Sequence, residues 1–267
     1  MTVPVPILLY HSVSTEPAPI IAPFAVTPAT FRRQLDMIVE AGLTPMTVRA
    51  YVETLEDEGR PLPERPVVMT FDDGWADFTD AAAALAERHV VATLYVTTGL
   101  LQGGARGGTM LGVEGRHGLA WDQLPELARL GIEIGAHTVS HPQLDAIPIG
   151  RARGEILRSR HLLEDSVQDD VVTFAYPHGY SSRAVRDVVA LVGFRGACGV
   201  KDALSSRDDD RFCLGRLTVR RTTSLERFGA WLHGVGAPVA PRTERVPTRL
   251  WRGYRRSRAY VSRAGGP

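Results

Sequence analysis

The sequence predicts an α/β fold in a single domain: a distorted (β/α)7-type barrel with mainly parallel strands. Three observations support this prediction. Short apolar runs alternate with amphipathic stretches, which is typical of strands that are buried between helices. The chain has 267 residues, of which 44% are hydrophobic, so it can bury a sizeable core. The number of strand–helix units that can be counted, seven or eight, is that of a closed or nearly closed barrel.

The expected strands are short runs rich in apolar and β-branched residues. In chain order they cover residues 7–10, 43–47, 67–71, 92–96, 132–136, 173–176, 194–198 and 214–219. The expected helices cover residues 28–40, 48–58, 75–88, 121–129, 151–165, 182–191 and 224–232. Capping residues stand at several of the helix starts, among them Thr27, Ser182 and Ser224.

Charge divides the chain into two parts. The formal net charge is only +1, which gives no global electrostatic case for binding nucleic acid. We therefore expect a barrel over residues 1–235 and a basic C-terminal tail over residues 236–267. Between Arg242 and Arg263 the tail holds eight arginines and one acid, Glu244. Two interpretations stay open: a peripheral membrane contact with anionic lipid, or a solvated tail.

The sequence also predicts where the protein is located. Its first residues lack a basic start and a long apolar run, so they do not resemble a signal peptide. No stretch approaches the roughly 20 apolar residues of a membrane span. We expect a cytoplasmic protein, either free or peripheral at the inner face of the membrane. Its two cysteines are too few for a disulfide framework.

Two short motifs carry the most chemical information. The first, Thr-Phe-Asp-Asp-Gly, places Asp72 and Asp73 directly after an apolar strand, and Gly74 allows the chain to turn there. The second places His137 and His141 four residues apart, so that one turn of chain can bring them to one face. Two imidazoles and the Asp73 carboxylate form a ligand set that suits a catalytic zinc ion, while Asp72 is left free as a base.

The polar groups lie where separate strands are expected to end. His11 follows the first strand, Asp72 the third and His137 the fifth, and residues 176–179 follow the sixth. In parallel barrels the C-terminal ends of the strands meet on one face, so these groups are expected to converge. The glycine-rich residues 99–118 are expected to form a loop or lid above that face.

These motifs resemble the polysaccharide deacetylase superfamily, that is, carbohydrate esterase family four with its NodB-homology domain. The resemblance rests on residues 70–74, residues 137–141 and the proline-containing residues 175–179, and it covers roughly residues 5–232. It implies that Asp72 is the general base and that Asp73, His137 and His141 bind a divalent metal, Zn²⁺ or else Co²⁺ or Ni²⁺. It also implies that the backbone N–H of His178 stabilises the oxyanion.

This sequence departs from the family pattern in three ways. His178 stands where the third motif usually has an aromatic Tyr or Phe, and no arginine precedes Pro177 to hold the base. The late strand reads Leu-Gly-Arg at residues 214–216, without the expected histidine. However, Leu-Tyr-His at residues 9–11 resembles the circularly permuted members, the poly-N-acetylglucosamine deacetylases. That resemblance makes His11 the general acid.

The expected function is metal-dependent hydrolysis of the N-acetyl group of an amino sugar, with release of acetate. The expected substrate is a cytoplasmic glycoconjugate, lipid-linked sugar or oligosaccharide. A deformylase or a cyclic-amide hydrolase of the same superfamily stays open as an alternative. A non-catalytic module that binds sugar or lipid is the alternative from another class, although such a module needs neither a base nor an acid.

Overall fold

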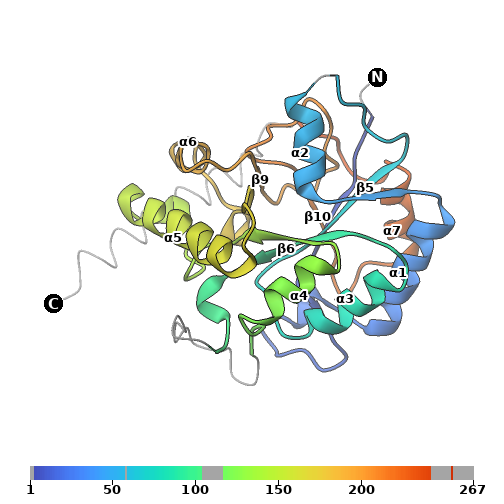
Figure 1. Ribbon diagram of the computed structural model, residues 1–267. Coiled ribbons are helices and arrows are strands. Elements are labelled where there is room, and N and C mark those ends of the chain that lie inside the picture. Colours follow the sequence, from blue (N-terminus) through green and yellow to red (C-terminus); the bar gives the residue numbers. More distant parts are fainter. Residues whose placement is uncertain (1–2, 58, 104–116, 242–253, 255–267) are drawn as a thin grey trace.

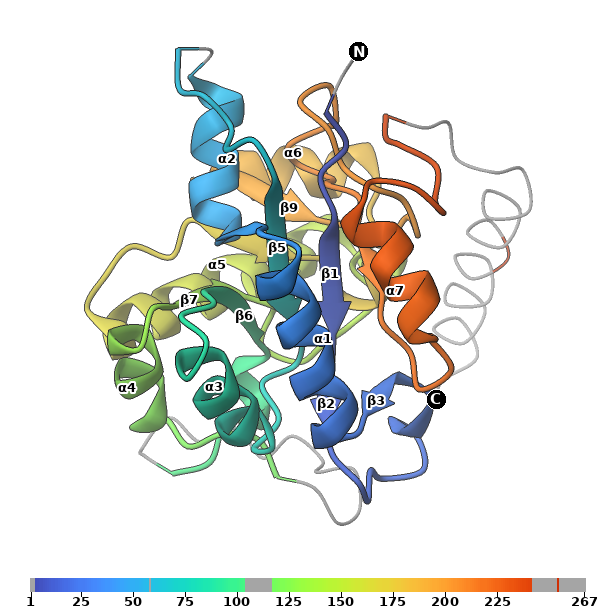
Figure 2. The same cartoon turned by 90° about the vertical axis from the view of Figure 1, so that its right-hand side faces the viewer.

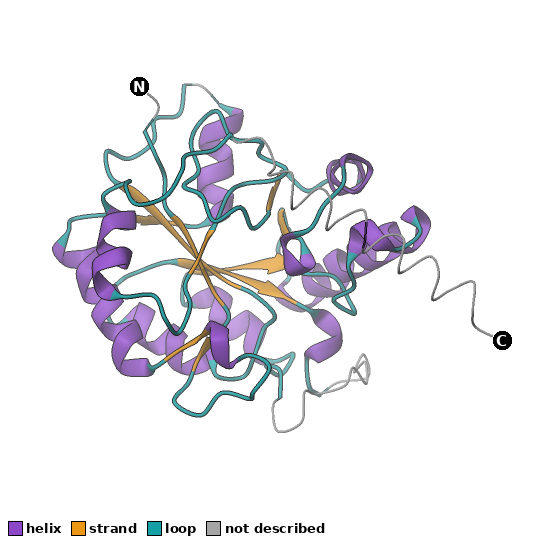
Figure 3. Cartoon of the chain, turned by 180° about the vertical axis from the view of Figure 1, so that it is seen from behind, coloured by secondary structure: helices purple, strands orange, loops and turns teal. Residues whose placement is uncertain are grey.

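The computed structural model describes residues 3–57, 59–103, 117–241 and 254. A curled sheet lies at the centre of the molecule and helices surround it (Figures 1 and 3). Its strands run in the order β10-β1-β5-β6-β7-β8-β9, with β4 beside the start of β5. Every pairing between these strands is parallel. The predicted α/β fold with mainly parallel strands is confirmed.

The strands of the main sheet are β1 (Ile7–Tyr10), β4 (Thr44–Met46), β5 (Pro66–Phe71), β6 (Ala92–Val96), β7 (Ile132–Ala136), β8 (Thr173–Ala175), β9 (Gly196–Cys198) and β10 (Leu217–Thr218). The helices described are α1 (Pro28–Glu40), α2 (Val48–Glu56), α3 (Phe78–Ala86), α4 (Gln123–Arg129), α5 (Ile149–Val167), α6 (Arg183–Leu191) and α7 (Leu225–Leu232). A small second sheet pairs β2 (Ser12–Val13) with β3 (Ala25–Val26), which the sequence did not predict.

The two edges of the main sheet approach each other through the residues just before β10. The Leu214 N–H donates to the Ala197 carbonyl at 2.8 Å, and the Gly199 N–H donates to the Leu214 carbonyl at 2.9 Å. Leu217 and Thr218 then pair with β1 on the other side. The chain between Leu214 and Thr218 therefore spans the gap between β9 and β1, and Arg216 lies in the middle of this span.

Side chains alternate between the inside of the curled sheet and its helix-covered outside. Ile7, Val68 and Tyr95 belong to a buried cluster that α2 joins through Tyr51 and Val52. Their strand neighbours, including Met69 and Phe71 of β5, pack instead in the larger cluster with the outer helices. Because both faces of the strands are largely buried, most strand residues are apolar. Thr93, Glu133 and Thr173 are exceptions, and both threonine hydroxyls donate to the Glu133 carboxylate.

Packing explains one glycine of the interior. A Cβ atom built on Gly135 of β7 would lie only 2.5 Å from the ring of Tyr95. No side chain fits at that position, because Tyr95 fills the space in front of the neighbouring strand.

Helix boundaries differ from the sequence expectation mainly near the site. The helix expected from residue 75 begins at Phe78, because Asp73 and Gly74 have positive φ angles and turn the chain. Trp75 instead pairs with Gly118 in an isolated bridge, and the Ala76 N–H donates to the His117 carbonyl. The helix expected over residues 151–165 is longer, Ile149–Val167.

Two segments singled out in the sequence lie largely outside the residues that the structure describes. Most of the expected lid, residues 104–116, lies outside the described residues, as does the basic segment from Arg242 to Arg263 apart from Tyr254. The division between barrel and tail at residue 235 stays a prediction. Ala240, five residues beyond it, is hydrogen-bonded to the barrel: its N–H donates to the Leu204 carbonyl at 2.8 Å. Within the described residues, no helix combines the length and the apolar character that crossing a membrane requires.

Candidate metal centre and active site

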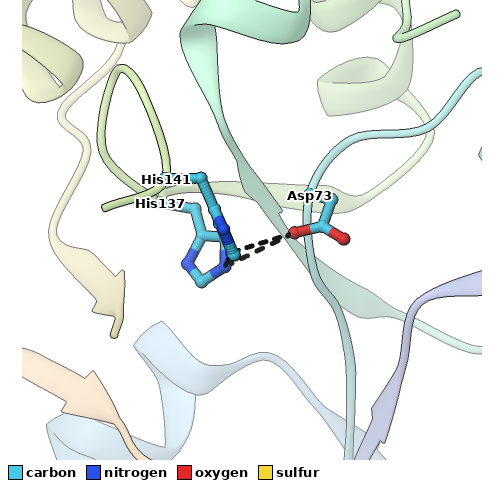
Figure 4. Close-up of side chains that lie close together, drawn as sticks. All are labelled: Asp73, His137 and His141. Atoms are coloured by element: carbon cyan, nitrogen blue, oxygen red, sulfur yellow. Dashed lines mark hydrogen bonds and ion pairs between the residues drawn. The ribbon is translucent and has the colours of Figure 1, made fainter. Parts of the chain in front are cut away.

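Asp73, His137 and His141 form a compact group at the C-terminal ends of β5 and β7. Their ligand atoms all lie within 4.8 Å of one another. The Asp73 Oδ1 atom is 3.6 Å from His137 Nε2 and 3.4 Å from His141 Nε2, and the two Nε2 atoms are 3.2 Å apart. Figure 4 shows both imidazole rings turned toward the Asp73 carboxylate.

These distances fit a single divalent metal ion. Ligand atoms about 2.0–2.2 Å from a tetrahedrally coordinated zinc ion lie roughly 3.3 Å from one another. The three measured separations, 3.2, 3.4 and 3.6 Å, bracket that value. The set also leaves coordination positions free for water and substrate, as catalytic sites do.

The environment of His137 prepares it to bind a metal. Its Nδ1 atom lies 2.7 Å from the Ala175 carbonyl, so Nδ1 carries the proton and Nε2 presents its lone pair to the site. Burial is the main cause that lowers the pKa of His137 to about 3, against the opposing effect of the Asp72 charge. The neutral imidazole, which is the form that binds metals, is therefore present at neutral pH.

A carboxylate on α5 holds the loop between the two histidines. Glu155 accepts hydrogen bonds from the N–H groups of Val139 (3.0 Å) and Ser140 (2.8 Å), and from the Ser140 hydroxyl (2.7 Å). Within and just after this stretch, Thr138 and His141 have positive φ angles of 69° and 52°. Such angles are costly for residues other than glycine, and the Glu155 hydrogen bonds offset part of that cost.

Asp72 is held by a buried ion pair. Both of its oxygens accept from the guanidinium of Arg216, at 2.7 Å each. Arg216 is itself fully buried; it also donates to the Gly199 carbonyl and the Thr70 hydroxyl, and it lies over the ring of Tyr95. Bidentate pairing fixes the plane of the carboxylate as well as its position.

The same ion pair sets the charge of Asp72. Burial raises the pKa of this carboxyl, but the positive charge of Arg216 and its hydrogen bonds outweigh burial and lower the pKa to about 2. Asp72 is therefore ionised at neutral pH. Its Oδ2 lies 3.9 Å from His137 Nε2, beside the candidate metal site.

The role of Arg216 was not predicted from the sequence. No arginine precedes Pro177 and residues 214–216 lack a histidine, but these two departures from the family pattern do not by themselves point to Arg216. The structure shows that an arginine from a different strand contacts Asp72. The signal available was an arginine within an otherwise apolar strand, which is rare unless the charge is paired.

The structure brings His178 into the same site and places His11 near its carboxylates. The ring of His178 lies 4.6 Å from that of His141 and 6.3 Å from that of Tyr180, and His178 has a positive φ angle of 59°. The Asp72 N–H donates to the Tyr10 carbonyl at 3.0 Å, so His11, the next residue, follows β1 beside the Asp72–Asp73 turn. Burial lowers the pKa of His11, and the negative charges of Asp73 and Asp72 oppose that effect. Its Nδ1 atom is buried without a hydrogen-bond partner among the described residues. The catalytic roles of both histidines stay predictions.

Trp75 supports the metal ligand Asp73 rather than a substrate. Its indole Nε1–H donates to Asp73 Oδ2 at 2.9 Å, and the ring is only 6% exposed. This hydrogen bond occupies one oxygen of the carboxylate and leaves Oδ1 facing the two histidines. Groups that orient a ligand in this way typically account for 10–100-fold in metal affinity.

Replacing Trp75 with phenylalanine is therefore expected to raise the dissociation constant for zinc by about 10-fold or more. The measurement is competition with a chromophoric chelator. Trp121→Phe is the matched control, because the Trp121 Nε1 atom is buried and makes no hydrogen bond to a described residue. Equal zinc affinity in the two variants would show that the indole hydrogen bond does not support the ligand.

A parallel α/β barrel with a buried, ionised carboxylate beside an Asp–His–His group at its strand ends defines a class of hydrolase. The chain belongs to the polysaccharide deacetylase family, whose sequence profile matches residues 59–197, just over half of the chain. Members of this family hydrolyse carbon–nitrogen bonds other than peptide bonds, and this protein is such a hydrolase. The family resemblance inferred from the motifs is confirmed.

Particular relatives extend over most of the chain. YxkH of Bacillus subtilis (strain 168), named as a polysaccharide deacetylase, is 25% identical over 231 residues, which are 86% of this chain and 76% of YxkH. The deacetylase PplD of Streptococcus pyogenes, solved with acetate, has 23% identity and a TM-score of 0.74, covering 85% of this chain and 96% of PplD. IcaB from Ammonifex degensii has 22% identity and a TM-score of 0.71, and the match covers 86% of this chain and 97% of IcaB. At these identities, the two solved structures show a shared fold.

Proposed function

We propose that this protein removes the N-acetyl group from an amino sugar of a glycoconjugate and releases acetate in a metal-dependent reaction. The observation that carries the proposal is the ionised base Asp72, fixed by Arg216, beside the metal-binding geometry of Asp73, His137 and His141. A binding module would gain nothing from an ionised carboxylate buried at this cost. The fold shared with deacetylases supports the same reaction class.

Asp73, His137 and His141 would hold the metal ion. Imidazole nitrogens favour Zn²⁺, and Co²⁺ or Ni²⁺ are also suitable. When bound, such an ion polarises the amide carbonyl and makes water more acidic. Trp75 and the Ala175 carbonyl would orient two of the ligands before the ion binds.

The other groups of the site would move protons and stabilise charge. Asp72 would accept the proton of the attacking water, because its carboxylate is ionised and Arg216 fixes its orientation. His11 would protonate the departing nitrogen; burial lowers its pKa, so an imidazolium formed there gives up its proton readily. The backbone N–H of His178 would donate to the oxyanion.

We propose that the substrate is a cytoplasmic glycoconjugate, lipid-linked sugar or oligosaccharide. We also propose that the enzyme belongs to the permuted, poly-N-acetylglucosamine-type branch of the family. Leu-Tyr-His at residues 9–11, which ends β1, supports the branch. Substrate profiling on soluble and lipid-linked acetamido sugars tests both the proposed substrate class and the proposed branch.

The first test is the metal content of the purified protein, measured together with acetate release from N-acetylglucosamine oligomers and a lipid-linked analogue. We expect about one divalent ion per chain and activity that a chelator abolishes and zinc restores. Bound metal without acetate release would favour a deformylase or a cyclic-amide hydrolase. Failure to bind any divalent metal would contradict the ligand assignment and favour the binding module.

A further inference from the structure

An exposed arginine lies beside the proposed general acid. The chain leaves β10 at Thr218, and the Val219 N–H donates to the Leu9 carbonyl of β1, so Arg220 emerges close to the end of β1 where His11 stands. The guanidinium of Arg220 lies over the ring of Phe24, 4.9 Å from its centroid. The same ring lies 5.1 Å from the ring of His11. Phe24 thus contacts both the proposed acid and the cation.

The backbone fixes the two loops that carry these side chains. The Arg221 N–H donates to the Pro23 carbonyl at 3.0 Å, and the Arg220 N–H donates to the Thr223 hydroxyl at 2.9 Å. Figure 2 shows the chain leading into α7 reaching the β2–β3 pair, at the end of the molecule toward which β1 points. The Arg221–Pro23 hydrogen bond joins the two loops and so holds Arg220 against Phe24. We call the surface formed by Phe24, Arg220 and Arg221 the rim of the site.

Two other arginines in this part of the chain have carboxylate partners: Arg211 pairs with Glu56 and Arg216 with Asp72. Among the residues that the structure describes, no carboxylate forms an ion pair with Arg220, and its side chain is exposed. A guanidinium that stacks on an aromatic ring keeps its edge free, and that edge matches two oxygens of a phosphate group.

The position of the rim relates this charge to the substrate. If His11 protonates the departing nitrogen, the amino sugar must lie with that nitrogen toward His11, and its neighbouring ring substituents then lie toward Phe24 and Arg220. The carbon that carries the nitrogen, C2, is bonded to C1 and C3. With C1 turned toward Phe24, a phosphate on the anomeric oxygen lies on the Arg220 side of the site.

We propose that Arg220 is a specificity-determining residue that binds an anionic phosphate group on the amino-sugar substrate, close to the N-acetyl group. This inference rests on the proposed function for the identity of the reaction. The binding of the phosphate itself does not depend on turnover. Phe24 holds the guanidinium in place, and Arg221, exposed beside it, adds positive charge to the same rim.

The test compares N-acetylglucosamine 1-phosphate with methyl N-acetylglucosaminide, which lacks the charge, in both acetate release and equilibrium binding. We expect the wild-type protein to prefer the phosphate by about tenfold in kcat/KM and in affinity, since a charge-assisted contact at an exposed site has roughly this size and is weakened by salt. Arg220→Ala should remove the preference, because it weakens binding and kcat/KM for the phosphate much more than for the methyl glycoside. Arg220→Lys should retain part of it, because lysine keeps the charge without the planar fork.

Arg211→Ala is the matched control. Arg211 also stacks on an aromatic ring, Phe212, at 5.0 Å, but it pairs with Glu56 on α2. The Arg211→Ala variant should keep the wild-type preference for the sugar phosphate over the methyl glycoside. A diphosphate diester of the same sugar, tested alongside, distinguishes a simple sugar phosphate from a substrate whose phosphate is linked to a carrier.

The outcomes separate this inference from the proposed function. Binding that depends on phosphate and on Arg220, without acetate release, would support the phosphate site and contradict the deacetylase reaction. Equal binding of the two sugars by the wild-type protein, or equal losses on both sugars in Arg220→Ala, would overturn the role of Arg220 whatever the reaction.

Discussion

Replacing Asp72 with asparagine is expected to lower kcat for acetate release by about 10³-fold, within the range of 10²–10⁴ that general base catalysis contributes. Asparagine has nearly the same shape as aspartate but cannot accept a proton from water. The wild-type carboxylate is ionised at neutral pH because Arg216 lowers its pKa to about 2 despite burial. Steady-state kinetics on an acetamido sugar measure the loss.

Asp73→Asn is the matched comparison, because it makes the same chemical change one residue away. Asp73 belongs to the candidate metal group and Asp72 does not. We therefore expect Asp72→Asn to retain its metal and Asp73→Asn to lose most of it, with low activity in both. Activity within tenfold of the wild type in Asp72→Asn would contradict the assignment of Asp72 as the base.

Replacing Arg216 with methionine is expected to lower the free energy of unfolding by about 3–5 kcal/mol, because removing one partner of a buried ion pair leaves the other charge without compensation. Arg216 is 0% exposed and Asp72 only 4% exposed, so solvent cannot take over the lost contact. Urea denaturation of the metal-free protein measures the change and keeps metal binding out of the comparison. Activity should fall as well, because nothing then fixes the carboxylate.

A double-mutant cycle separates the charge from the packing. The variant that combines Arg216→Met with Asp72→Leu removes both charges and should recover most of the stability lost by Arg216→Met alone. Arg216→Lys keeps the charge but not the two parallel hydrogen bonds, so we expect intermediate stability. A loss below about 1 kcal/mol in Arg216→Met would mean that the pair contributes no more than an exposed salt bridge does.

Local patterns were enough to predict many of the helices and strands and several of their bounds. Thr27, Thr47, Ser182 and Ser224 accept hydrogen bonds from backbone N–H groups at the starts of α1, α2, α6 and α7, as capping residues do. The apolar strands at residues 7–10 and 92–96 were predicted with their observed bounds. The prediction was wrong at residues 75–77, which were expected to be helical. Contacts with residues 117 and 118, distant in the sequence, determine the backbone conformation there.

All three residues of the candidate metal group could likewise be predicted from sequence. Asp73, His137 and His141 follow strands in two separate motifs, and parallel strands bring their C-terminal ends together. The partners of these residues could not be predicted in this way. Glu155 lies on α5 and reaches the histidine loop only because that helix packs against β7.

The sequence by itself determined the fold class, the order of the strands along the chain and the residues that can bind a metal, because each depends on local periodicity or on a short motif. Only the tertiary structure decided which side chains hold those residues in place. Arg216 lies 144 positions from Asp72 and meets it because the curled sheet brings β10 beside β1, which in turn pairs with β5. A contact between residues so distant in the chain is set by the closure of the sheet, which no local pattern records.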